Sequence, residues 1–212
     1  GRRALGKVPT EQRRFEYRFL VLDEPETVNA FAIPGGHIYV FSGLIRAAGS
    51  EAELASVLAH EIAHVVAGHP SQQLAAQLGL AALMELVFGK NPGLLSQIAG
   101  QIAAQGYLAA NSRESETEAD LLGVRYLAAA GWDARAMPAF FEKIDGMSRA
   151  GSSPVQTFFD THPDPGDRAA QLEKVIASEQ LGGGQESVLG SFPETRARLG
   201  GPLGEGQPPP ER

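Results

Sequence analysis

The sequence contains no cysteine. A disulfide framework is therefore excluded, and no thiolate can serve as a nucleophile or as a metal ligand. A metal ion would have to be held by histidine and carboxylate side chains, a ligand set that suits zinc or another divalent transition ion. The absence of cysteine does not by itself indicate a compartment.

The chain also lacks an excess of positive charge and a long apolar run. Its net charge of -7 argues against a nucleic-acid partner and gives no reason to expect electrostatic binding to an anionic membrane. The most apolar stretch, residues 78–89, is too short to span a bilayer and contains Glu85. No secretory signal is present at the start. We expect a soluble chain; a signal or anchor, if one exists, would precede Gly1.

The composition is that of a globular protein, with 43% hydrophobic and 20% charged residues in a chain of 212. We expect residues 1–180 to form one domain. From Leu181 onward glycine and proline dominate, which predicts that residues 181–212 form a tail that is loose or draped over the surface.

Periodicity predicts an α+β fold, in which a small N-terminal sheet packs on a mainly helical body. Strands are predicted at 14–22, 28–33 and 37–41, and Pro34-Gly35-Gly36 between the last two predicts a hairpin. Capping residues and glycine stops predict the helices. The first predicted helix begins at Ser50 and is ended by Gly68 and Pro70. Two helices are predicted across 72–107, on either side of a turn at 89–93. Further helices are predicted at 112–130, 133–149 and 167–180, and a loop at 151–166.

The predicted helix that begins at Ser50 contains His60-Glu61-Ile62-Ala63-His64. Histidines four residues apart project from one face of a helix and can share a metal ion, and Glu61 can reach a water at that metal as a general base. A bare H-E-x-x-H pattern also fits two histidines that only pack or face solvent. Its position on a well-capped amphipathic helix favours the metal site.

A catalytic zinc ion needs three protein ligands and one open position. The residues after His64 do not follow the metzincin pattern, because Ala67 and Pro70 stand where that pattern has glycine and histidine. We interpret His69 as a histidine at the end of the helix, favourable near its C-terminal dipole, and not as a ligand.

The other common third ligand is a glutamate on a later helix, and residues 112–120 offer several. Glu116 and Asp120 are four apart, so their carboxylates lie on one face, where one can bind the metal while the other accepts the N–H of a ligating histidine. Periodicity does not choose among Glu114, Glu116 and Glu118, and such an acidic run is also typical of a solvated helix face.

Three segments resemble, in order, the zinc metallopeptidases that include HtpX, the CAAX prenyl proteases and the periplasmic BepA-type proteases. They are Asn29–Gly36, Glu51–His64 and Ser112–Asp120, and the resemblance extends roughly from Phe15 to Ile176. It implies a zincin-like domain of the gluzincin type over residues 1–180, with one zinc ion per chain and the activity of a zinc-dependent endopeptidase.

The resemblance also assigns roles to individual residues. The family pattern S-R-x-x-E-x-x-A-D selects Glu116 as the third ligand beside His60 and His64, with Asp120 as the outer partner of a ligand. Glu61 takes the role of general base. Replacing Glu61 by glutamine should then keep the metal and abolish turnover.

Residues 161–168 resemble the family segment H-P-x-x-x-x-R near the end of the domain. His162 is a candidate to stabilise an oxyanion or to fill the open zinc position transiently. Arg168 is a candidate for the same oxyanion, and the alternative is a structural loop in which it pairs with an acidic neighbour. Tyr107 and Tyr126 could also donate to an oxyanion, but a helical tyrosine is more often part of the core.

The strand predicted at 28–33 is a candidate for substrate binding, because an extended peptide can pair with an edge strand. Its residues Asn29, Ala30, Phe31 and Ala32 would then contact a peptide or unfolded protein; the alternative is an ordinary edge strand. Residues 72–107 are expected to pack as core helices, and the alternative is a lid hinged at 89–93.

Two other classes of function compete with a protease. One is a non-catalytic or gated chaperone or assembly module on a protease-like scaffold, although this chain keeps the complete set of motif residues. The other is a zinc hydrolase of small amides, which the segment Asn29–Gly36 disfavours. The resemblance further implies a bacterial envelope protein, periplasmic, with a role in protein quality control and a peripheral association with the envelope. The sequence does not predict an oligomeric state.

Overall fold

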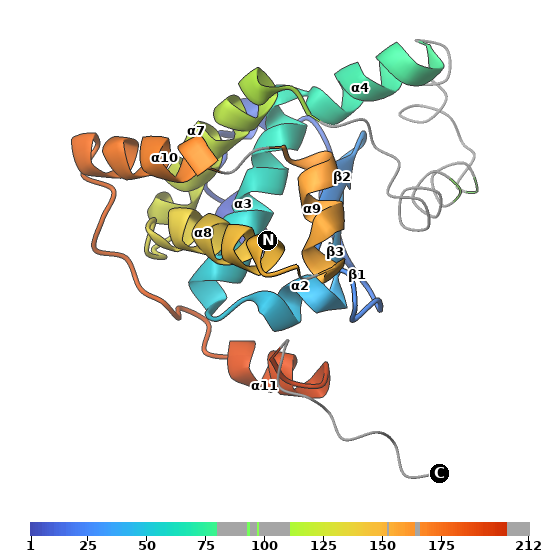
Figure 1. The fold of residues 1–212 in the computed structure, drawn as a ribbon. Helices are drawn as coiled ribbons and strands as arrows, with labels where there is room; N and C mark the ends of the chain where they lie inside the picture. The colour runs from blue at the N-terminus through green and yellow to red at the C-terminus, as the bar shows by residue number, and fades with distance from the viewer. Residues whose placement is uncertain (80–92, 94–96, 98–110, 152, 164–165, 203–212) are drawn as a thin grey trace, which may run out of the picture.

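The computed structural model describes residues 1–79, 93, 97, 111–151, 153–163 and 166–202. A long helix, α3 (Glu51–Ala67), lies in the middle of the molecule, with a small sheet on one side and helices α7 (Arg113–Ala129), α8 (Ala136–Arg149) and α10 (Gly166–Ser178) on the other (Figure 1). This arrangement confirms the α+β class and the helical body.

The sheet has three strands in the order β1-β3-β2. The strands β2 (Ala30–Ile33) and β3 (His37–Phe41) form the predicted antiparallel hairpin, and the glycines of its turn, Gly35 and Gly36, have φ angles of 92° and 87°. The strand β1 (Arg18–Leu22) runs parallel to β3. It is shorter than the predicted strand 14–22, and the side chain of Val21 within it is 59% exposed.

Helix α3 begins and ends where the sequence predicts. The Ser50 hydroxyl caps it by accepting the backbone N–H of Glu53 at 3.2 Å, and Gly68 ends it in the left-handed conformation at φ 82°. The prediction that Pro70 helps to end this helix is wrong. Pro70 lies in the first turn of a new helix, α4 (His69–Leu78), where its missing N–H is tolerated.

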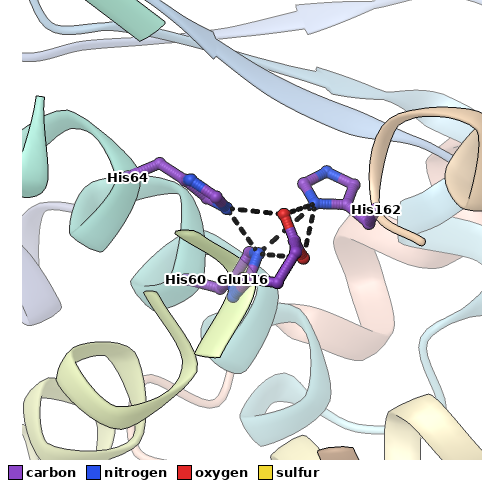
Figure 2. A group of neighbouring side chains, drawn as sticks. All are labelled: His60, His64, Glu116 and His162. Atoms are coloured by element: carbon purple, nitrogen blue, oxygen red, sulfur yellow. Dashed lines mark hydrogen bonds and ion pairs between the residues drawn. The ribbon is translucent and has the colours of Figure 1, made fainter. Parts of the chain in front are cut away.

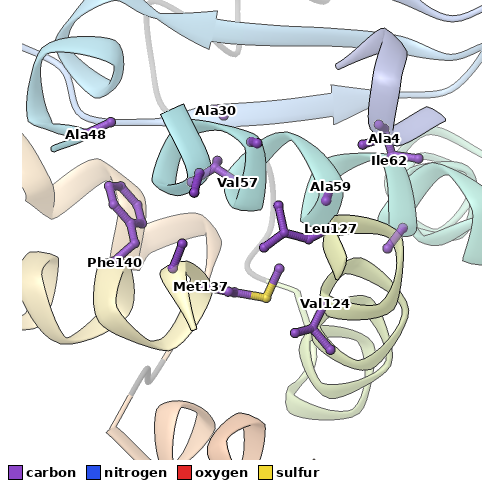
Figure 3. Packing of buried hydrophobic residues seen from close by; sticks show 14 of the residues in the cluster. Ala4, Ala30, Ala48, Val57, Ala59, Ile62, Val124, Leu127, Met137 and Phe140 are labelled. Atoms are coloured by element: carbon purple, nitrogen blue, oxygen red, sulfur yellow. The ribbon is translucent and has the colours of Figure 1, made fainter. Parts of the chain in front are cut away.

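Helix α7 packs along α3 and its Ser112 cap accepts the N–H of Ser115 at 3.1 Å. Buried side chains between α3, α7 and α8 form the centre of the core (Figure 3). Alanines on α3 let the helices approach closely, while larger side chains of α7 and α8 fill the space between them. The core residues labelled in Figure 3 include Val57, Ala59, Ile62, Val124, Leu127, Met137 and Phe140.

Several short elements were not predicted. They are α1 (Arg2–Leu5), α2 (Ser42–Ala47), two 3-10 turns, Thr10–Gln12 and Ser153–Val155, and α9 (Gln156–Thr161), which lies within the predicted loop. The backbone N–H of Val28 donates to the carbonyl of Pro154 at 2.8 Å, and the side-chain amide of Asn29 donates to the carbonyl of Thr157 at 3.1 Å. These bonds attach the 3-10 turn Ser153–Val155 and α9 to the chain at the start of β2. Helix α8 begins at Ala136, three residues later than predicted; Arg135 and not Asp133 is its N-cap, and the side chain of Asp133 accepts the backbone N–H of Arg135 at 3.0 Å.

The described part of the C-terminal tail lies against the body. The carboxylate of Glu51, in the first turn of α3, accepts bonds from the Trp132 indole, from the Ser187 hydroxyl and from the backbone N–H groups of Val188, Leu189 and Gly190. The tail continues into α11 (Phe192–Arg198). Of the two predicted alternatives, these contacts agree with a draped tail up to residue 202.

Most of the region 72–107 lies outside the described residues, including the predicted turn at 89–93 and Tyr107. Its first part is α4. Among the described helices, none is long and apolar enough to cross a bilayer.

Candidate metal centre

The centre is built on one face of α3. His60 and His64 are one helical turn apart, both are buried, and their Nε2 atoms lie 2.9 Å from each other. The capped, straight run of α3 fixes the spacing, so two imidazole nitrogens point to the same place.

Helix α7 brings a carboxylate to the same point. Glu116 is 0% exposed; its Oε1 lies 3.2 Å from Nε2 of His64, and its Oε2 lies 3.5 Å from Nε2 of His60. Glu114 and Glu118 are exposed. Of the three glutamates among which periodicity could not choose, only Glu116 is therefore buried beside the two histidines.

The donor atoms lie about as close together as the ligands of one metal ion. Ligand atoms about 2.0–2.2 Å from a tetrahedral zinc lie about 3.3–3.6 Å from one another. The three distances among His60, His64 and Glu116 are 2.9, 3.2 and 3.5 Å, so one lies within this range and two are shorter. Nδ1 of His162 completes the group, 3.4 Å from Nε2 of His60 and 3.2 Å from either oxygen of Glu116 (Figure 2). These four residues can hold a metal ion.

An outer pair of charges supports this group. Oδ1 of Asp120 lies 2.9 Å from Nδ1 of His60. Arg168 donates to both oxygens of Asp120, at 2.7 and 2.8 Å, and its Nη1 lies 2.6 Å from Oε2 of Glu116. Its guanidinium also lies 4.6 Å from the centre of the Phe141 ring. Arg168 therefore pairs with acidic neighbours, from helix α10 and not from a loop, and its role at an oxyanion stays a prediction.

Burial and neighbouring charge set the protonation of the metal-free site. For His60, burial alone would lower the pKa, but the carboxylates of Asp120 and Glu116 outweigh it and raise the pKa to about 10. For His64, burial and the charge on His60 lower the pKa to about 3. For Glu116, burial would raise the pKa, yet the nearby histidines, His162 foremost, hold it well below its usual range. Glu116 is therefore ionised and His64 neutral, the forms that bind metal.

Glu61 lies beside the donor atoms and does not belong to them. It is buried, and desolvation raises its pKa. Its Oε1 lies 3.4 Å from Nε2 of His162. A carboxylate with a raised pKa next to a metal centre is suited to take up and release a proton.

The candidate substrate strand passes next to this carboxylate. Asn29, Ala30, Phe31 and Ala32 are all buried, and β2 is an edge of the three-stranded sheet. His162, at the end of α9, lies between this edge and the donor atoms, with its Nε2 3.5 Å from the carbonyl oxygen of Ala30. The cavity beside the site has a volume of only about 10 Å³, enough for about one water molecule.

Two residues contribute to the centre in ways that the sequence reasoning missed. His69 contacts Nδ1 of His64, although we interpreted it only as a helix-end residue. Gly123 lies where α7 touches the backbone of His60. Gly123 is seven residues after Glu116 and three after Asp120, so it lies on the same face of the helix. This spacing could have been recognised in the sequence. Tyr126 is buried and its hydroxyl donates to Gln12, so it belongs to the core as expected.

A buried H-E-x-x-H helix with a glutamate from a later helix, on an α+β scaffold, defines the class of metal-dependent peptidases. Comparison with known families agrees, because the model of Peptidase family M48 matches residues 4–176. The chain therefore belongs to Peptidase family M48. This membership confirms the resemblance found in the sequence and places the chain in a family of peptidases.

Similar proteins come from bacteria and from mitochondria. The beta-barrel assembly-enhancing protease of Escherichia coli K12 is 35% identical over 205 residues, which cover 86% of this chain and 41% of that protein. The mitochondrial metalloendopeptidase OMA1 of Arabidopsis thaliana is 32% identical over 164 residues, which cover 77% of this chain and 32% of that protein. The chain thus spans well under half the length of these relatives.

Proposed function

We propose that this chain is a zinc-dependent endopeptidase in which His60, His64 and Glu116 hold one zinc ion and Glu61 is the general base. The observation that carries the proposal is the convergence of two imidazole nitrogens and one carboxylate at zinc-like spacing, with a separate buried carboxylate beside them. A zinc ion held by these residues would supply a Lewis acid that polarises the peptide carbonyl and lowers the pKa of a water molecule, so that the water can lose a proton and attack the carbonyl carbon.

The protein side chains then move the proton. Glu61 takes the proton of the attacking water, and its raised pKa favours holding it until the amine leaves. Glu61 then gives the proton to the leaving nitrogen. Its buried position, next to the N–H of Ala32, keeps the carboxylate oriented toward the donor atoms.

A peptide substrate would pair with β2. An extended chain along Asn29 to Ala32 would put a scissile carbonyl within reach of Glu61, and backbone pairing would tolerate many sequences. His162 lies in this path and completes the donor group. We therefore infer that His162 occupies the fourth position at rest and withdraws, with α9, when a substrate enters, and that it can then donate to an oxyanion. Arg168 holds Asp120 and Glu116 in place throughout.

The substrates would be protein chains rather than small amides. One relative is named a beta-barrel assembly-enhancing protease. This name supports a role for the present chain in envelope protein quality control, in the periplasm, with unfolded envelope proteins as substrates. The mitochondrial location in the name of OMA1 is the other possibility for the compartment. The competing function, a chaperone or assembly module without turnover, is favoured by the very small cavity at the site.

The test is cleavage of casein and of a quenched peptide by purified wild type and Glu61→Gln, with bound zinc quantified in both. Glu142→Gln, an exposed glutamate on α8, is the matched control. We expect both variants to hold zinc, Glu142→Gln to cleave like the wild type, and Glu61→Gln to lose at least about a hundredfold in rate. Equal cleavage by Glu61→Gln would contradict the assignment. Zinc binding without cleavage by the wild type would favour the module without turnover.

A further inference from the structure

His69 is buried and contacts the proposed metal ligand His64 on the side of its ring that faces away from the other donor atoms. It is the first residue of α4, and its Nδ1 lies 2.9 Å from Nδ1 of His64, with the two rings edge to face. Its other nitrogen, Nε2, lies 3.3 Å from Oε2 of Glu118 on α7. The side chain of His69 thus connects the α3 ligand to a carboxylate at the surface.

The chemistry of these contacts fixes where the protons lie. His64 presents its Nε2 to His60 and Glu116, so this nitrogen must be free of a proton to bind a metal. The proton of neutral His64 is then on Nδ1 and is donated to Nδ1 of His69. His69 must in turn carry its own proton on Nε2, where the Glu118 carboxylate accepts it. Every nitrogen and proton in this chain of hydrogen bonds has a partner.

We propose that His69 is a positioning residue that holds His64 in the metal-binding tautomer and ring orientation. The inference rests on the proposed role of His64 as a zinc ligand. Histidines that bind metal usually donate their second N–H to an outer acceptor. His60 has such a neighbour in Asp120, at 2.9 Å, and His69 is the equivalent for His64.

The turn between the two helices delivers this side chain. Gly68, in the left-handed conformation at φ 82°, ends α3, and α4 begins at His69 with Pro70 in its first turn. The five-residue separation of His64 and His69 would not bring two side chains together on one continuous helix face, because neighbours there are three or four apart. The break in the helix is what makes this contact possible.

The test measures the zinc dissociation constant, by competition with a chromophoric chelator, for wild type, His69→Leu, His69→Asn and His37→Leu. In His69→Asn the amide oxygen takes the place of Nδ1 and can still accept from His64. His37, at the start of β3, is a control outside the site. We expect His69→Leu to bind zinc about 10–100-fold more weakly, His69→Asn to recover most of this loss, and His37→Leu to be unchanged.

A second measurement needs no variant. In zinc-loaded wild type labelled with 15N-histidine, the nitrogen resonances should show His64 protonated on Nδ1 and His69 protonated on Nε2. A His69 protonated on Nδ1 would overturn the inference, as would zinc affinities of His69→Leu and wild type that are equal. Equal weakening in His69→Leu and His69→Asn would also overturn it. A wild type that binds no zinc would instead contradict the proposed metal centre, and the inference with it.

Discussion

Gly123 on α7 lies directly against the backbone of His60 on α3. A Cβ added to Gly123 would lie 3.0 Å from the His60 nitrogen and 3.1 Å from its Cα. Because the neighbouring atoms are backbone, they cannot rotate away. The absence of a side chain here lets α7 approach α3 closely enough for Glu116 and Asp120, on the same face of α7, to reach the histidines.

Gly123→Ala should therefore weaken both the fold and the metal centre. We expect the free energy of unfolding to fall by about 1–3 kcal/mol, because overpacking pushes the two helices apart, and zinc affinity to fall with it. Gly146→Ala, at a position on α8 where a Cβ meets nothing within 4 Å, is the matched control. It should raise stability by up to about 1 kcal/mol. Urea unfolding measures both, and equal stability of the two variants would refute the close contact.

Arg168→Leu should be strongly destabilising. It would remove the guanidinium that pairs with the buried carboxylates of Asp120 and Glu116 and leave His60 as their cationic neighbour; breaking a buried pair costs about 3–5 kcal/mol. Arg125→Leu is the matched control, because Arg125 makes a similar bidentate contact with Glu179 at the surface. Loss of a surface ion pair should lower the free energy of unfolding by no more than about 1 kcal/mol. Urea unfolding of the zinc-free variants gives both values; similar losses would show that Arg168 does not stabilise the site.

The stability of the zinc-free protein should depend on pH on both sides of about 6.5, the ordinary pKa of histidine. The pKa of His60 is raised to about 10, so the folded state binds a proton that the unfolded state loses, and stability falls as pH rises from 6.5 toward 10. The pKa of His64 is lowered to about 3, so the unfolded state binds the extra proton, and stability falls as pH decreases from 6.5 toward 3.

Thermal unfolding in the presence of a chelator, at a series of pH values from 5 to 9, measures this dependence. We expect the transition temperature to pass through a maximum at about pH 6.5 and to fall on either side. With zinc bound, the fall on the alkaline side should be smaller, because a His60 that binds zinc is neutral. Asp120→Asn should also flatten the alkaline limb, since the carboxylate that raises the His60 pKa is lost. A transition temperature that is constant across this range would contradict the charge assignment.

Much of the fold could be predicted because its signals are local. The cap at Ser50, the stop at Gly68 and the turn at Gly35 and Gly36 each depend on residues close in sequence, and all three are observed. The donor set could be approached in the same way, because His60 and His64 share a helix. The choice of Glu116 over its exposed neighbours depends on which face of α7 is buried, and only the family resemblance supplied it.

The elements that were missed depend on distant contacts. Helix α9 is short, and α9 and the 3-10 turn before it are held by hydrogen bonds from Asn29 and Val28, more than a hundred residues earlier. The described part of the tail is fixed by Glu51, which the sequence identified only as part of a helix start. The contact of His69 with His64 requires the break between α3 and α4, and helical periodicity cannot predict a side-chain contact across such a break.

Anomalous diffraction at the zinc edge, from crystals of zinc-loaded protein, shows whether His60, His64 and Glu116 hold the metal. We expect one strong peak per chain, about 2.0–2.2 Å from Nε2 of both histidines and from a carboxylate oxygen of Glu116. A peak elsewhere, or a peak that persists unchanged in crystals of Glu116→Gln, would contradict it.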